Sequence, residues 1–66
     1  NSSNEIGALI GLGYSYNMAG QKNQAISTFQ QLVSLLQKSS ANDPSVDAAI
    51  SNYQTIIQRL QAGEFI

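Results

Sequence analysis

Apolar residues recur every three or four positions along this chain, which is the spacing of one face of an α-helix. In the first third, the recurring apolar residues are Ile6, Leu9, Leu12, Tyr16 and Ala19. They predict a helix that begins at Ser3 or Asn4 and ends at Ala19. Ser2 and Glu5 have the spacing of a capping box at its start, in which hydroxyl and carboxylate each bond a free backbone amide.

A second apolar stripe follows after a short polar break. Its members are Ala25, Ile26, Phe29, Leu32, Val33 and Leu36, and they predict a helix from Lys22 to Lys38. Gly20 is suited to end the first helix, because glycine adopts the left-handed conformation of a helix C-cap without steric cost. The turn between the two helices is short, which favours an antiparallel pair.

The remaining apolar residues predict a third helix that runs to Ala62. They are Val46, Ala49, Ile50, Tyr53, Ile56, Ile57 and Leu60. Asp43-Pro44 marks its start, because aspartate caps a helix and proline fits the first turn, and Gly63 is well placed to terminate it. Residues 39–43 are then a polar linker, and no segment alternates as a strand does. The predicted fold class is all-α, with three helices and antiparallel neighbours.

Three glycines interrupt the first helical pattern, and each costs about 1 kcal/mol relative to alanine in a helix interior. They are Gly7, Gly11 and Gly13. For Gly13, close contact with another helix is the best explanation of how this cost is offset. Gly7 and Gly11 form a small-x-x-x-small pattern, which favours close packing of a further helix.

A set of spaced residues in the first two helices indicates how the helices meet. The set is Leu9, Leu12-Gly13, Tyr16, Gly20, Ala25 and Phe29. With this set, the segment 6–38 resembles one tetratricopeptide repeat, a helix–turn–helix unit of about 34 residues. The resemblance implies that Gly13 and Ala25 let the two backbones approach while Tyr16 and Phe29 fill the space beside them.

The chain departs from this family's pattern at three positions. Leu9 stands where the family often has tryptophan, Leu32 where it has a small residue, and Gln37 where it has proline. The third helix lacks a Leu-Gly pair, although Tyr53 echoes the aromatic position. We therefore interpret residues 44–62 as a capping helix behind a single repeat, within one domain of residues 1–66.

Repeats of this family usually hold other proteins, and the inner face of their first helix commonly binds a peptide. By spacing, the resemblance assigns that face here to Gly7, Ile10, Tyr14, Asn17 and Met18. The face lacks the lysine with which some repeats grip a C-terminal carboxylate. The predicted function is a protein–protein interaction module, an adaptor or assembly surface that binds a partner helix or peptide or self-associates.

Composition removes several other classes of function. The 66 residues include no cysteine and no histidine, which excludes zinc, haem and thiol chemistry within the chain. Glu5, Asp43 and Asp47 stand at helix starts, where carboxylates cap the helix or favour its dipole. We therefore expect no catalysis and no cofactor.

Charge and hydropathy exclude two further kinds of partner. The net charge is −1, and the cations Lys22, Lys38 and Arg59 are scattered, so we expect no nucleic-acid binding. The longest apolar-leaning stretch, residues 6–20, falls short of the roughly 20 apolar residues of a membrane span. The absence of cysteine suits both cytoplasm and periplasm.

One alternative to an independent module follows from size. A lone repeat exposes an apolar face that a neighbouring repeat should cover. The chain is then expected to form a homo-oligomer or to pack against flanking repeats. Otherwise it is a regulatory or structural fragment of a larger protein, possibly an enzyme, that folds against its missing neighbour.

Overall fold

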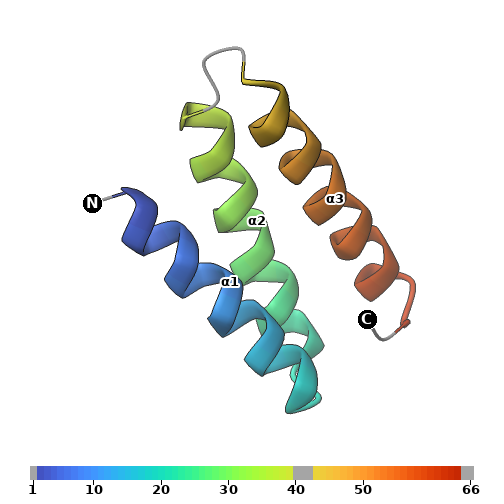
Figure 1. Cartoon of the computed structure of the whole chain (residues 1–66). Helices are drawn as coiled ribbons and strands as arrows, with labels where there is room; N and C mark the ends of the chain where they lie inside the picture. The colour runs from blue at the N-terminus through green and yellow to red at the C-terminus, as the bar shows by residue number, and fades with distance from the viewer. Residues whose placement is uncertain (1, 40–42, 65–66) are drawn as a thin grey trace.

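A computed structural model of the chain describes residues 2–39 and 43–64, with side chains from residues 4–38 and 43–64. It contains three helices, α1 (Ser2–Met18), α2 (Lys22–Ser39) and α3 (Pro44–Gln61), which run antiparallel to their neighbours (Figure 1). No strand occurs in the described residues. The predicted all-α fold class is confirmed, and the predicted helix ends lie within two residues of the observed ones.

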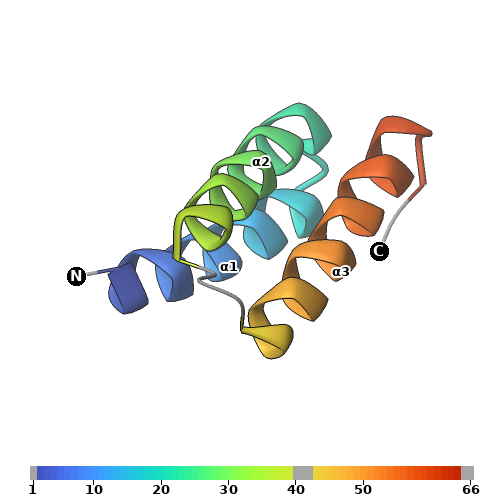
Figure 2. The ribbon, with the colours of Figure 1, turned by 90° about the horizontal axis from the view of Figure 1, so that it is seen from above.

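Helix α2 is the centre of the arrangement. Helices α1 and α3 both pack against α2, whereas no pair of Cα atoms from α1 and α3 comes within 8 Å in the described part of the chain. In the view from above, α1 runs beneath α2, and α3 lies to one side of this pair (Figure 2). The Cα atoms extend over 33 × 22 × 13 Å. The backbones of α1 and α3 therefore lie against α2 and not against each other.

The ends of α1 and α3 follow from their glycines. Gly20 has φ 78° and donates its backbone N–H to the Asn17 carbonyl at 3.1 Å, while Gln21 donates to the Tyr16 carbonyl at 2.9 Å. These two bonds form a Schellman motif, which requires the positive φ that glycine adopts freely. Gly63, with φ 88°, closes α3 by the same pair of bonds.

The start of α3 is the capped start that the sequence predicts. Asp43 lies in the extended region (φ −91°, ψ 113°) and is followed by Pro44 in the first turn. Its carboxylate accepts the Ser45 backbone N–H at 2.9 Å, which satisfies one of the free amides of a helix N-terminus. The cap predicted from Ser2 lies outside the described side chains.

A polar bond also joins two elements that are far apart in the sequence. The Lys22 ammonium at the start of α2 donates to the Gly63 carbonyl beyond the end of α3, at 2.6 Å. The turn after α3 is thus tied to the first residue of α2.

The buried apolar core comes from α2 and α3. Its members are Ala25, Phe29, Leu32, Val33, Leu36, Ile56, Ile57 and Leu60. Helix α1 adds only half-buried apolar side chains, which are Ile6, Leu9, Ile10 and Tyr16. The apolar stripes predicted for α2 and α3 therefore face the core or its edge.

One part of the predicted stripe of α1 is wrong. Leu12 is 45% exposed, and Ala19 is exposed as well. Helix α1 instead turns Gly13 and Asn17, which are four residues apart, toward α2. Because successive residues are rotated by about 100° around a helix, Leu12 then lies at the margin of the contact with α2.

Candidate functional site

The contact between α1 and α2 is centred on Gly13 and Phe29. A Cβ atom added to Gly13 would lie 2.8 Å from both Cε1 and Cζ of the Phe29 ring, well inside van der Waals contact. Phe29 itself has 0% exposure. The predicted close approach at Gly13 is confirmed, but the atoms nearest to its bare side belong to Phe29 and not to Ala25.

Three aromatic rings connect the three helices. The rings of Tyr14 and Phe29 meet edge to face, with centroids 5.3 Å apart and planes at 79°. Phe29 stacks on Tyr53 with centroids 5.8 Å apart and planes at 20°. Such pairs contribute about 0.5–1.5 kcal/mol beyond the area they bury. The rings therefore couple α1 and α3, whose backbones do not meet.

Tyr53 also has a shifted ionisation. Burial raises the pKa of its hydroxyl above the ordinary value, and the neighbouring Tyr14 hydroxyl adds to the rise. Burial disfavours the charged phenolate, and a second phenolate nearby would repel it. Folding therefore favours the protonated form of Tyr53.

We expect this shift to make the fold sensitive to alkali. Because the folded pKa lies above the unfolded one, the contribution of Tyr53 to stability is fully present below the unfolded pKa of about 10. It is lost as pH rises through the folded pKa. Thermal melts at increasing pH should show a melting temperature that falls less steeply in Tyr53→Phe than in the parent chain. If the melting temperature falls equally steeply with pH in both proteins, the raised pKa of Tyr53 is contradicted.

The structure separates the five residues that the sequence assigns to a partner-binding face. Met18 is 86% exposed and Tyr14 is 38% exposed; Gly7 is also exposed, and Ile10 is half-buried against the core. Asn17 differs, because only 4% of it is exposed. Four of the five therefore reach the surface of α1, whereas a partner would not reach the side chain of Asn17 in this conformation.

All large apolar side chains that are exposed in the described residues lie on α1. They are Leu12, Tyr14 and Met18. Tyr14 and Met18 share one side of α1 with Gly7 and Gly11, where an added Cβ atom would meet nothing within 4 Å. Leu12 lies on the other flank of the helix, about 160° around its axis from Tyr14. We call Gly7, Gly11, Tyr14 and Met18 the α1 surface.

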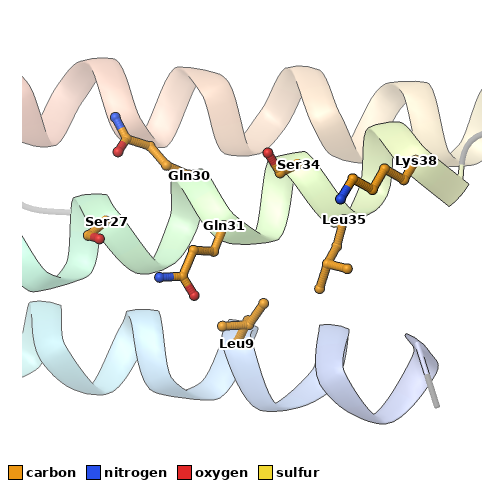
Figure 3. A pocket seen from close by; sticks show the side chains of 7 residues that line it. All are labelled: Leu9, Ser27, Gln30, Gln31, Ser34, Leu35 and Lys38. Atoms are coloured by element: carbon orange, nitrogen blue, oxygen red, sulfur yellow. The ribbon is translucent and has the colours of Figure 1, made fainter.

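A shallow groove of about 430 Å³ follows the seam between α1 and α2. It is lined by Leu9, Ser27, Gln30, Gln31, Ser34, Leu35 and Lys38. Leu9 and Leu35 extend toward each other from the two helices, and Gln31 lies beside Leu9 (Figure 3). Lys38, near the end of α2, is the one charged residue of the lining.

A second groove, of about 450 Å³, lies between α2 and α3. Its lining consists of Gln30, Val33, Gln54, Ile57, Gln58 and Gln61. Figure 3 shows Gln30 leaving α2 on the side away from Gln31 and Leu9, so Gln30 borders both grooves. No ionisable side chain lines the second groove, which we call the glutamine groove.

Two features of the described residues bear on chemistry. No helix combines the length and the apolar character needed to cross a bilayer. No three acidic side chains gather where they would hold a metal ion in the described part.

Comparison of the chain with protein-family models, curated proteins and solved structures finds no match.

Proposed function

We propose that the chain is a protein–protein interaction module whose α1 surface binds a partner helix or peptide, or the same surface of a second copy. The observation that carries the proposal is that exposed Tyr14 and Met18 share one side of α1 with the uncovered Gly7 and Gly11. Exposed apolar side chains that gather on one surface mark interaction sites in soluble proteins. The module would act as an adaptor or assembly surface and perform no reaction itself.

The sequence of α1 supports a covered helix. It carries one charged residue, Glu5, in its first turn and none in its last, and its apolar residues are spread around the circumference. A helix that is apolar on most sides is usually enclosed by neighbours, yet within the described residues only the backbone of α2 lies close to that of α1. The bare backbone at Gly7 and Gly11 would let a partner helix approach closely.

We also propose that the chain is a single tetratricopeptide-like repeat with a capping helix, and two observations support this. Residues 6–38 form an antiparallel helix pair with a short turn at Gly20, and Gly13 of the motif receives the motif's Phe29. In the family, a small residue stands where Leu32 stands here. Leu32 is completely buried in the core, so the fold accommodates a large side chain at this position.

We expect Met18→Gln to weaken binding without weakening the fold. Met18 is 86% exposed, so its loss should change the free energy of unfolding of the monomer by less than about 0.5 kcal/mol. In a complex that buries the side chain, the loss is about 1.5–3 kcal/mol, which raises the dissociation constant about 10- to 150-fold. Sedimentation velocity over a concentration series measures self-association, and a urea titration measures stability.

Asn52→Gln on the exposed side of α3 is the matched control and should leave association unchanged. The pair Ile10→Ala with Tyr14→Ala should also weaken association while helicity largely persists. This pair does not separate binding from stability, because Tyr14 packs on Phe29 and its loss also destabilises the monomer. If Met18→Gln associates as strongly as the parent chain, the α1 surface is not the interface.

The competing proposal is a regulatory or structural fragment that folds against a missing neighbour of a larger protein. The one-sided backbone packing of α1, against α2 and not against α3, favours it. Circular dichroism of the isolated 66 residues across concentration separates the two proposals. A melting temperature that rises with concentration supports self-association. A chain without cooperative melting at any concentration supports the fragment.

A further inference from the structure

We propose that the partner of the α1 surface is a second copy of this chain, with the two α1 helices packed antiparallel about a two-fold axis. This rests on the function proposed above and narrows it to one partner in one orientation. Three features of α1 support it, which are the distribution of bulk along the face, the glycines that the monomer leaves uncovered, and the position of the charge.

The bulk on the α1 surface is divided between its two halves. Toward the N-terminus, Gly7 and Gly11 leave the backbone bare, because a Cβ atom added at either would meet nothing within 4 Å. Toward the C-terminus, Met18 is 86% exposed and Tyr14 is 38% exposed. One half of the face is therefore low, and the other half protrudes.

The spacing of these four residues makes the face complementary to itself. Gly7 and Met18 lie equally far, in opposite directions, from the midpoint between Gly11 and Tyr14. A two-fold axis at this midpoint, as in an isologous dimer, sets Met18 of each copy over Gly7 of the other and Tyr14 over Gly11. A parallel pair in register would instead crowd methionine on methionine and leave the glycines facing each other across a gap.

The glycines of α1 divide in the same way. Gly13 is occupied within the monomer, because an added Cβ atom would lie 2.8 Å from the Phe29 ring. Gly7 and Gly11 lower the helix propensity of α1 as well, yet no side chain of the described residues uses the space they leave. Small residues let two helix backbones approach closely, so a second α1 would use this space.

The charge on α1 also fits this orientation. Glu5 is the one charged residue of the helix, and it lies about 160° around the axis from Gly7, away from the face. In the antiparallel pair, the two Glu5 residues are about 22 Å apart along the axis, well beyond the screening length of about 8 Å in physiological salt. A parallel pair would hold both carboxylates at one level.

The short contact predicts a weak dimer. The two helices overlap over residues 7–18, which span about 18 Å. A strip of this length and one helix wide covers much less than the roughly 800 Å² per partner of a standard interface. Self-association should therefore occur between micromolar and millimolar concentration.

Exchanging the two residues of one pair tests the packing. Gly7→Met sets methionine against Met18 of the other copy and should weaken self-association about tenfold in sedimentation velocity, because the contact becomes overpacked. Adding Met18→Gly restores a small residue opposite each methionine and should recover most of the lost affinity. Asn52→Met on the exposed side of α3 is the control for an added methionine and should have little effect. A urea titration should find all these variants folded.

A spin label measures the orientation. The chain has no cysteine, so a nitroxide on Asn4→Cys, an exposed position of α1, labels one site per copy. Pulsed electron paramagnetic resonance should find the two labels about 25 Å apart, which is the axial separation of these positions in the antiparallel pair. In a parallel pair, the labels would lie side by side at about the 8–10 Å spacing of packed helices.

The outcomes separate this inference from the proposed function. A chain that stays monomeric at millimolar concentration overturns the second copy as partner, whereas a Met18 signal that still shifts with another protein upholds the α1 surface. Labels side by side, or an exchanged variant that associates no better than Gly7→Met, overturn the antiparallel pairing alone. Self-association that neither Gly7→Met nor Met18→Gln weakens overturns both.

Discussion

Gly13→Ala should destabilise the fold, although alanine favours helices over glycine by about 1 kcal/mol. The added Cβ would lie 2.8 Å from two carbon atoms of the Phe29 ring, and the ring is completely buried, so it has no free space to enter. Overpacking of this kind costs about 1–3 kcal/mol. A urea titration followed by circular dichroism measures the loss, and Gly13→Leu should show a larger one.

The chain supplies its own control for this substitution. A Cβ atom at Gly7 or Gly11, on the same helix, would meet nothing within 4 Å. Gly7→Ala and Gly11→Ala should therefore stabilise the monomer by up to about 1 kcal/mol through helix propensity alone. If all three alanine variants shift stability in the same direction, the packing assigned to Gly13 is wrong.

Phe29→Ala should leave the chain unfolded or without fixed tertiary packing. Truncating a buried phenylalanine costs about 3–5 kcal/mol, whereas a chain of this length is expected to have only about 3–10 kcal/mol in total. Phe29 is the ring that touches α1 at Gly13, Tyr14 at its edge and Tyr53 by stacking. Its loss therefore removes the packing that links all three helices.

Near-ultraviolet and far-ultraviolet circular dichroism together detect this outcome. Leu12→Ala is the matched control, because Leu12 is 45% exposed and its truncation should cost much less. A folded Phe29→Ala variant with a melting temperature near that of the parent chain would contradict the assigned core. Gly13→Ala combined with Phe29→Leu should cost less than the sum of the two single changes, since residues in contact are energetically coupled.

The sequence predicts the helices well because their signals are local. Gly20 ends α1 through its own positive φ, and Asp43 with Pro44 starts α3 through bonds within one turn. The stripes of α2 and α3 are clear for a similar reason, since polar residues occupy their opposite sides. Such features need no knowledge of tertiary contacts.

The orientation of α1 is harder to predict, and this explains the misplaced Leu12. Apolar residues occur on several sides of α1, so periodicity alone does not select the buried one. The choice is made by a contact with another helix, where the Phe29 ring enters at Gly13. The same rotation buries Asn17, at 4% exposure, although its polarity favours the surface.

The glutamine groove has no signal in the sequence for a different reason. Gln30 and Gln54 are 24 positions apart, and neither residue is unusual on a helix surface. The groove exists only because α2 and α3 lie side by side and bring these amides to one seam. Grooves formed between helices are visible only after the packing is known.

The most direct test of the interaction surface uses the single methionine of the chain. With ¹³C-methyl methionine, the protein has one labelled signal, from Met18 at the C-terminal end of the proposed interface. The account predicts that this signal shifts and broadens as the chain is concentrated from micromolar to millimolar, or when a partner that co-purifies with the full-length protein is added. A sharp signal that stays unchanged in both experiments would contradict it.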